Sequence, residues 1–177
     1  MRTTFTRLPK AGTVMVRACR SAAAAIGGRT GRRDTARAMS QENVEALRAG
    51  YEAVSKANLG AAFDDVHPEF ELKTGDRVPG AGTYRGGEAA TRFFQDLVEP
   101  FEEVTYEPQQ FFERGEQIVV YLLVRLQPSG SSAVLEYQIG ALWTFRDGKP
   151  ARCEIFPRRE EALEALGLSE QDAHAAS

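Results

Sequence analysis

Residues 117–147 hold the pattern that most restricts the fold. Two long apolar runs there are separated by four turn-forming residues, Pro128, Ser129, Gly130 and Ser131. The pattern predicts two long antiparallel strands joined by a tight turn, with Gln127 opposite Ser132. Side chains alternate across a strand, so one face of this hairpin is apolar throughout and must be covered. That face carries Ile118, Val120, Leu122, Val124, Leu126, Leu135, Tyr137, Ile139, Ala141, Trp143 and Phe145.

Residues 40–87 predict two helices, a strand and a loop. Ser40 is a good N-cap for a first helix that runs to about Ala57. Residues 59–66 form a short second helix, and residues 69–74 alternate as a half-buried strand. The glycine-rich residues 75–87 are expected to form a loop that acts as a rim or lid over a cavity.

The remaining order completes an α+β fold. The predicted elements are a third helix at 88–101, a strand at 103–113 that is interrupted at Pro108, the hairpin, a last strand at 151–156 and a closing helix at 158–166. We expect a curved antiparallel sheet that forms a cone, roofed by three N-terminal helices, with a short C-terminal helix. The mouth of such a cone is a natural small-molecule pocket.

Charge divides the chain into a basic N-terminal segment and an acidic body. Residues 1–38 hold nine basic residues and one acid, a net charge of +8, which leaves −11 for the rest because the whole chain carries −3. An acidic body repels nucleic acid, so nucleic-acid binding is not expected. Residues 1–38 are interpreted as an extension upstream of a working start at Met39, a disordered basic arm or a targeting segment. Residues 39–168 form the expected domain, and 169–177 a flexible tail.

Cysteine and histidine usage argues against metal and disulfide chemistry. Cys19 and Cys153 lie far apart, and so do His67 and His174, without the spacing of a disulfide framework or a zinc site. We therefore expect no metal and a reducing, cytoplasmic compartment. No apolar run approaches the roughly eighteen residues of a membrane span, so no membrane association is expected.

Five segments carry a family resemblance. They are SQENVEALRAGYEAVSKAN, FDDVHPEFEL, YRGGEAATRFFQDL, ALWTFRDGKPARCEIF and REEALEALGL. In type and order they resemble the SnoaL-like branch of the nuclear transport factor 2-like superfamily, over residues 39–168. The resemblance implies a cofactor-independent protein for a small apolar or oxygenated ligand. It also implies a homodimer through the outer sheet face, which matches the mixed face of the hairpin at Tyr121, Arg125, Glu136 and Gln138.

The steroid isomerases of that superfamily pair a helix tyrosine with a carboxylate base and a protonated carboxyl. Tyr51 stands at the matching place of the first helix, but Leu72 and Ala141 occupy the positions of the two carboxyls. Glu71 points away from the cavity by strand alternation. Without a base in reach of a substrate proton, general-base isomerisation is disfavoured.

Four residues are candidates for chemistry, each with a plainer interpretation. Tyr51 can donate to a ligand oxygen or simply belong to the core. Asp65 can serve the cavity mouth or end a solvated helix, and His67 can act as acid or base or bond to backbone in a turn. Asp76 can reach over the mouth or stay solvated on its loop. The expected ligand wall consists of Tyr51, Phe70, Leu72, Phe93, Leu122, Tyr137, Ile139, Ala141 and Trp143.

Two functions remain open from the sequence. One is an isomerase, cyclase or hydrolase that acts on an apolar oxygenated molecule, with Tyr51 polarising an oxygen and Asp65, His67 or Asp76 moving the proton. The other is a non-catalytic, dimeric module that binds a ligand or a partner. They are distinguished by geometry: enzyme chemistry needs polar groups that converge inside the cone on one ligand atom.

Overall fold

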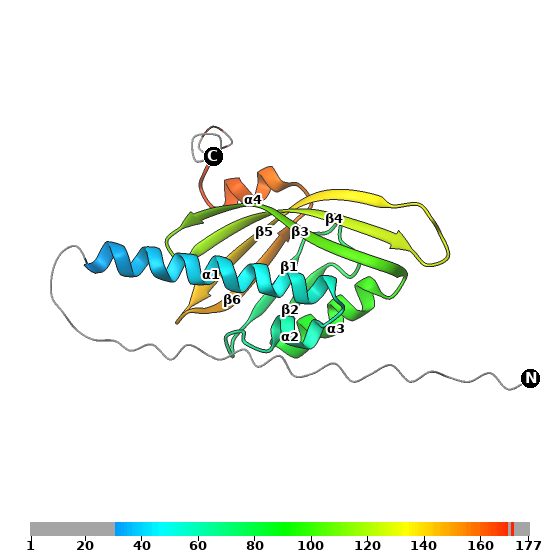
Figure 1. Cartoon of the computed structure of the whole chain (residues 1–177), viewed down its shortest axis with the longest axis horizontal. Helices are drawn as coiled ribbons and strands as arrows, with labels where there is room; N and C mark the ends of the chain where they lie inside the picture. The colour runs from blue at the N-terminus through cyan, green and yellow to red at the C-terminus, as the bar shows by residue number, and fades with distance from the viewer. Residues whose placement is uncertain (1–30, 170, 172–177) are drawn as a thin grey trace, which may run out of the picture.

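The protein folds as an open six-stranded sheet with helices on both faces (Figure 1). The computed structural model describes the backbone of residues 31–169 and 171, and side chains from Met39 onward. Three helices lie against one face of the sheet and a fourth lies on the other (Figure 1). The elements are α1 (Gly31–Ser55), α2 (Leu59–Phe63), β1 (Glu71–Thr74), β2 (Gly82–Arg85), α3 (Gly87–Val98), β3 (Phe101–Arg114), β4 (Gln117–Pro128), β5 (Leu135–Arg146), β6 (Lys149–Phe156) and α4 (Arg159–Ala165).

The predicted α+β cone is confirmed, except that one pair of neighbouring strands is parallel in a sheet that was expected to be antiparallel. The strand order is β2-β1-β6-β5-β4-β3, and all neighbours are antiparallel except β1 and β6, which run parallel. The main core fills the space between the sheet and α1, α2 and α3. Predictions for residues 1–30, 170 and 172–177 lie outside the described residues.

Helix α1 is longer than predicted. It begins at Gly31, so Ser40 lies inside the helix and the predicted N-cap is wrong. The apolar stripe was read correctly, since Leu47, Tyr51 and Val54 are buried in the main core. The helix ends as the chain turns at Ala57, whose φ is 55°.

The β4–β5 hairpin keeps the predicted faces but not the predicted register. Leu126 pairs with Leu135, which places Gln127 opposite Val134 rather than Ser132, so every pair is shifted by two residues. An even shift keeps each side chain on its face. The connection is longer because it forms a loop of its own, in which the Gln127 side-chain amide donates to the Ser131 carbonyl at 2.9 Å.

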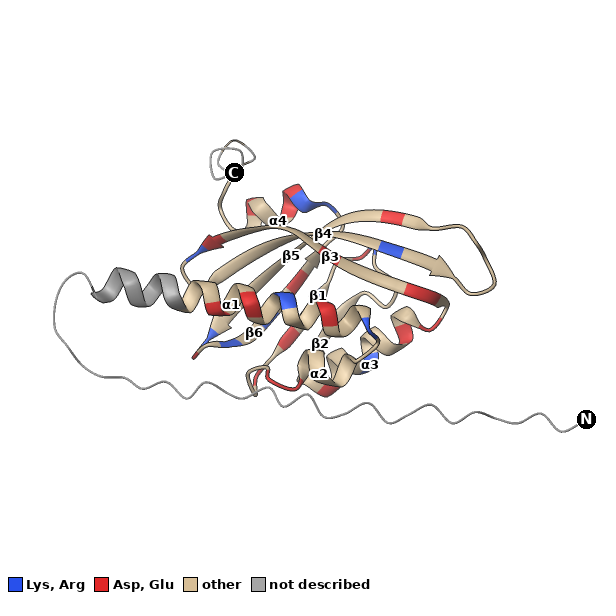
Figure 2. Cartoon of the chain, in the orientation of Figure 1, with Lys and Arg blue, Asp and Glu red and all other residues tan. Residues whose placement is uncertain are grey.

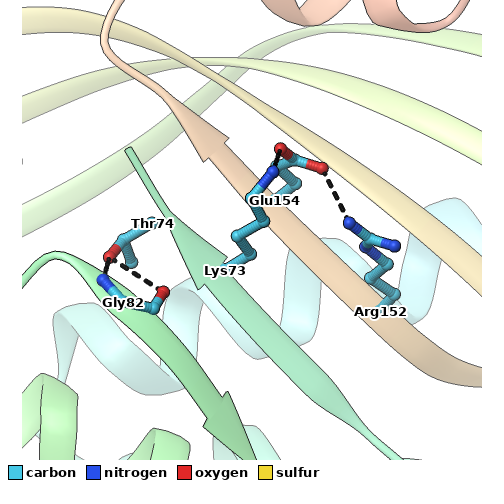
Figure 3. Close-up of polar contacts among 5 residues, drawn as sticks. All are labelled: Lys73, Thr74, Gly82, Arg152 and Glu154. Atoms are coloured by element: carbon cyan, nitrogen blue, oxygen red, sulfur yellow. Dashed lines mark hydrogen bonds and ion pairs between the residues drawn. The ribbon is translucent and has the colours of Figure 1, made fainter. Parts of the chain in front are cut away.

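Residues 75–87 contain a strand and not only a loop. β2 pairs antiparallel with β1, and Thr74 closes the turn between them (Figure 3). The Thr74 hydroxyl accepts a hydrogen bond from Gly82 N at 3.0 Å and donates one to Gly82 O at 3.4 Å. The tip of this hairpin is held by a hydrogen bond from the Tyr84 hydroxyl to the Gly80 carbonyl. The prediction that residues 75–87 form only a loop is therefore wrong, because part of this segment forms a β-hairpin with β1 that hydrogen bonds of Thr74 and Tyr84 stabilise.

The outer face of the sheet is partly covered by α4. Leu163 and Leu166 pack with Val119 and Leu142 in a second apolar cluster. The helix crosses the sheet at Gly140, where a Cβ atom would overlap the Ala162 side chain and lie 3.0 Å from Arg159 Cα. Only glycine allows this close approach of helix and strand.

Candidate functional site

A small cavity lies between the helices and the sheet. Its volume is about 60 Å³, and apolar side chains of α1, α2 and α3 form most of its wall. Its more exposed lining residues are Ala46 and Gly50 of α1, Ala62 of α2, the adjacent Val66, and Pro150 of β6. The cavity therefore opens between α1, α2 and the start of β6.

Tyr51 and Trp143 meet at this cavity from opposite walls. Trp143 Nε1 donates a hydrogen bond to the Tyr51 hydroxyl oxygen at 2.8 Å, and the two rings meet edge to face at 6.2 Å. Phe70 stacks on the other side of Trp143 at 6.2 Å. The indole uses the hydroxyl as an acceptor, so the Tyr51 proton is left to be donated elsewhere.

The protonation state of Tyr51 follows from its burial. Burial raises its pKa well above the ordinary value of 10, with a smaller contribution from the nearby Cys153. The hydrogen bond from Trp143 acts in the opposite direction but is outweighed. Tyr51 is therefore a neutral phenol at physiological pH, which makes it a hydrogen-bond donor and neither a base nor a nucleophile.

A second phenol, Tyr106 of β3, lines the same cavity. It is 9% exposed, and burial raises its pKa to about 12. Its backbone is fixed to the end of α1, because Tyr106 N donates to the Ser55 hydroxyl at 2.9 Å. Sequence reasoning missed this residue, although the alternation of Val104 and Tyr106 in a strand places both on the inward face.

Cys153 lies beside Tyr51 and Trp143 but offers no nucleophile. It is the register partner of Trp143 on β6 and is 2% exposed. Burial raises the pKa of the Cys153 thiol far above its usual range. The group is a neutral thiol that contributes to packing, since only a thiolate is reactive.

The carboxylates and the histidine expected to move protons lie outside the cavity. Asp65 is exposed and pairs with Lys149 Nζ at 2.5 Å, and Asp76 is exposed on the β1–β2 turn. His67 makes the backbone contact considered in its plainer interpretation, since its Nδ1 accepts a hydrogen bond from Glu69 N at 3.1 Å. No Asp, Glu, His or Lys lines the cavity among the residues that the structure describes.

The family model for the SnoaL-like domain matches residues 47–153. The chain belongs to the SnoaL-like family. The matched span runs from Leu47 on α1 to Cys153 on β6, so it contains Tyr51, Tyr106 and Trp143. No curated protein matches the sequence.

Solved structures share the SnoaL-like fold at low sequence identity. TerC, co-crystallised with polyporic acid, is 22% identical with a TM-score of 0.59, covering 71% of this chain and 98% of its own. An NTF2-like protein of unknown function from Burkholderia pseudomallei is 21% identical with a TM-score of 0.59, covering 71% and 97%. A hypothetical protein with a ketosteroid isomerase-like fold from Catenulispora acidiphila, in complex with trimethylamine, is 13% identical with a TM-score of 0.58, covering 72% and 95%.

The predicted ligand wall of this SnoaL-like chain is only partly brought together. Tyr51 and Trp143 line the cavity, whereas Phe70 and Leu72 are fully buried behind it. Tyr137 is 48% exposed near the far end of the sheet. The other predicted members, which lie in the core or at its margin away from the cavity lining, are Phe93, Leu122, Ile139 and Ala141.

Metal clusters and membrane-spanning helices are both absent from the described part of the chain. The described residues contain no group of three or more His, Cys, Asp or Glu side chains placed to hold a metal ion. Within the same part of the chain, no helix combines the length and apolar character needed to cross a membrane. The cavity itself is lined by the neutral phenols Tyr51 and Tyr106 within a largely apolar wall.

Proposed function

We propose that this protein binds a small, largely apolar molecule through an oxygen acceptor, with the Tyr51 hydroxyl as the donor. The observation that carries the proposal is the hydrogen bond from Trp143 Nε1 to the Tyr51 oxygen. It fixes the orientation of the phenol and leaves its proton for a ligand. A donor that is held in an apolar wall is the usual way in which a pocket selects one ligand orientation.

Tyr106 supplies a second donor in the same proposal. Tyr106 and Tyr51 both line the one cavity, and the proximity of Tyr106 contributes to the raised pKa of Tyr51. A carbonyl oxygen has two lone pairs and accepts two hydrogen bonds. The ligand class that fits is a ketone or a related carbonyl compound without charge, since the described cavity wall has no charged side chain to pair with one.

The size of the cavity sets how the ligand enters. A cavity of about 150 Å³ is enough for benzene in a well-studied case, and about 60 Å³ is well below that. Only the oxygen-bearing end of a ligand fits inside, and the rest extends through the opening beside Ala46, Gly50 and Ala62. The complexes of TerC with polyporic acid and of the Catenulispora acidiphila protein with trimethylamine support small-molecule binding by this fold.

Holding a ligand is favoured over general-base chemistry. A base must lie within hydrogen-bond reach of the proton it removes. Asp65 is held by Lys149, His67 by its own turn, and Asp76 lies on the β1–β2 turn. A non-catalytic, ligand-binding role therefore agrees best with the geometry.

A cofactor-independent isomerase, cyclase or hydrolase is the second candidate. It is favoured by the same Tyr51–Trp143 hydrogen bond, because a phenol polarised by an indole N–H is a good donor to an oxygen that gains negative charge. That function requires Asp65, His67 or Asp76 to approach the cavity in the bound state.

The single tryptophan of the sequence provides the test. The indole N–H resonance and the fluorescence of Trp143 are followed while cyclohexanone or methylenecyclohexane is added. The two probes have nearly the same shape, but only the ketone has an oxygen. We expect the ketone to bind more tightly, and Tyr51→Phe or Tyr106→Phe to weaken it about two- to tenfold, the worth of one hydrogen bond.

The controls separate this role from packing. Tyr137→Phe alters an exposed tyrosine away from the cavity lining and should leave binding unchanged. Affinity should also be constant between about pH 6 and pH 9, because both phenols keep their protons there. Equal binding of the two probes, or an unchanged ketone affinity in Tyr51→Phe, would contradict the proposal.

We further propose a homodimer in the cytoplasm. The free thiol of Cys153 is consistent with a reducing compartment. Among the four residues predicted for the dimer contact, Tyr121 is buried, with the Arg159 guanidinium 5.3 Å above its ring. Arg125, Glu136 and Gln138 remain accessible on the outer face beyond α4.

A further inference from the structure

Residues 64–69 connect α2 to β1 beside the mouth of the cavity, and we call them the strap. None of the strap residues is buried, whereas Phe63 and Phe70 at its two ends are 6% and 0% exposed. The rings of Phe63 and Phe70 pack against each other, with centroids 6.0 Å apart. The strap therefore has two ends fixed in the core and a middle that lies at the surface.

Val66 is the part of the strap that closes the cavity. Its side chain lines the cavity together with Pro150 at the start of β6, and both are half-buried. Apart from Pro68, the rest of the strap is polar. A surface segment that contributes one apolar side chain to the interior has little packing to hold it, and such segments open most easily.

Two ion pairs join the strap to the β5–β6 turn. Asp65 Oδ1 lies 2.5 Å from Lys149 Nζ, and Glu69 Oε2 lies 2.8 Å from Arg146 Nη1. Acidic positions follow one another along the strap, and basic positions flank the turn that it meets (Figure 2). Each of the four side chains is at least 46% exposed, so water can replace either partner.

The β5–β6 turn is the rigid side of this contact. It continues the ladder of the two strands, and Asp147 and Gly148 have the positive φ values, 53° and 74°, that tight hairpin turns require. The Pro150 carbonyl accepts a hydrogen bond from His67 N at 2.9 Å. The strap belongs to no helix or strand, so it is the strap that moves when these contacts break.

Internal hydrogen bonds keep the strap folded as one piece. Glu69 N donates to His67 Nδ1 at 3.1 Å, and Phe70 N donates to His67 O at 2.9 Å. Pro68 restricts the backbone between them, because its ring fixes φ. The strap can therefore swing as a unit without unravelling.

We propose that the strap is a latched gate, which swings about Phe63 and Phe70 to admit a ligand to the cavity. The two ion pairs to the β5–β6 turn are its latch. An exposed ion pair contributes little to stability, which suits a contact that must break often, and removing both pairs should raise the open population by up to about tenfold. The role in ligand entry rests on the proposed function, whereas the opening itself does not.

Hydrogen exchange followed by NMR tests the latch in the full chain without a ligand. The double variant Asp65→Asn, Glu69→Gln removes both ion pairs with little change of shape. We expect His67 N–H and Trp143 Nε1–H to exchange faster together, by up to about tenfold. The first loses its acceptor when the strap opens, and water then reaches the second at the cavity wall.

The opposite double variant, Arg146→Gln, Lys149→Gln, breaks the same two pairs from the side of the turn. It changes the net charge in the opposite direction, so a rise in exchange common to both doubles reports the latch and not the local charge. Gly86 N–H donates to Phe70 O at 2.7 Å at the fixed end of the strap. It should stay as protected as in the native chain.

A matched control removes two ion pairs elsewhere. Glu71→Gln, Glu161→Gln makes the same charge change as the first double variant but breaks the pairs with Arg85 and Arg158. Exchange of His67 N–H and Trp143 Nε1–H should keep its native rate there. Circular dichroism confirms that all three double variants stay folded.

Ligand kinetics connect the opening to the proposed function. NMR line shapes of the Trp143 indole give the rates at which cyclohexanone enters and leaves. In Asp65→Asn, Glu69→Gln both rates should rise by the same factor, so the dissociation constant changes little, whereas a damaged pocket would raise the exit rate alone. If the ketone does not bind the native chain, the proposed function fails, and hydrogen exchange still decides whether the strap opens.

Three results would overturn the inference. The first is exchange of His67 N–H that is as slow in both latch variants as in the native chain or in the matched control. The second is exchange of Gly86 N–H that rises as much as that of His67, because the whole region then unfolds and no strap swings. The third is cyclohexanone that enters at the native rate although His67 exchange has risen, because the strap then does not control entry.

Discussion

Trp143 and Tyr137 lie six residues apart in the same row of β5, yet their side chains are 9% and 48% exposed. Both are large, both carry one polar atom, and both point to the inner face. Trp143 stands where β6 lies alongside and the helices lie above, with Cys153 as its register partner. Tyr137 has only β4 beside it, with Val124 as its partner. Burial is therefore set by the neighbours of a strand and not by its own alternation.

The largest expected difference follows from replacing each of these two residues by alanine. Trp143→Ala leaves a large hole in the core and should lower the free energy of unfolding by about 3 to 5 kcal/mol. Tyr137→Ala should cost less than about 1 kcal/mol in the monomer, because its side chain is half exposed. Urea unfolding followed by far-UV circular dichroism, at low protein concentration, measures both. Equal costs would show that the first half of β5 is covered after all.

The sequence predicted correctly which side chains of the β4–β5 hairpin share a face, although the predicted register was wrong. The predicted pairing was in error by two residues, and side chains repeat every two residues, so Ile118, Val120 and Trp143 kept their face. An error of one residue would have reversed both faces. Strand alternation is thus a more robust prediction than strand pairing.

Where β6 stops was not predictable from the same pattern. The length of β6 depends on the chain leaving the sheet at Phe156 to form α4. The sequence of residues 135–139 contains no signal of where β6 ends. Leu135 and Tyr137 were therefore expected on the covered, inner face. The hydrogen bond between Tyr51 and Trp143 was equally beyond reach, because it depends on how α1 lies over β5. The inward position of Tyr51 itself followed from the helical stripe.

The second expected effect concerns the point where the two halves of β5 meet. Gly140→Ala places a Cβ atom against Ala162 and the backbone of Arg159, so α4 must move away from the sheet. We expect a loss of about 1 to 3 kcal/mol in the free energy of unfolding, typical of overpacking. Gly60→Ala is the matched control, since nothing lies within 4 Å of its Cβ position in α2, and it should stabilise by up to about 1 kcal/mol.

Thermal unfolding of Gly140→Ala and Gly60→Ala tests whether α4 packs tightly against β5 at Gly140. A melting temperature of Gly140→Ala that equals the native value would mean that α4 does not press on β5. The sequence shows a glycine at this position but not the helix that requires it. This is a close approach between elements about twenty residues apart in the chain, which no local pattern records.

The smallest expected effect concerns ion pairs on the outer face of the sheet. One group lies beside residues 140–146 of β5, which pair with β6, and the other lies beside residues 135–139, the unpaired half. Beside the paired half, Glu154 accepts hydrogen bonds from Lys73 at 2.5 Å and Arg152 at 3.1 Å (Figure 3). Beside the unpaired half, Arg125 joins Glu107 at 2.6 Å and Glu136 at 2.7 Å, and these two partners raise its pKa. The Glu154 side chain is 20% exposed and that of Glu136 is 56% exposed.

Double-mutant cycles should rank the two pairs by this exposure. We expect the coupling of Lys73 with Glu154 to be below about 1 kcal/mol and to fall as salt is added. The coupling of Arg125 with Glu136 should be smaller still in the monomer, because water reaches both groups. A coupling of Arg125 with Glu136 that equals or exceeds that of Lys73 with Glu154 would show that side-chain exposure does not set the rank of the two pairs.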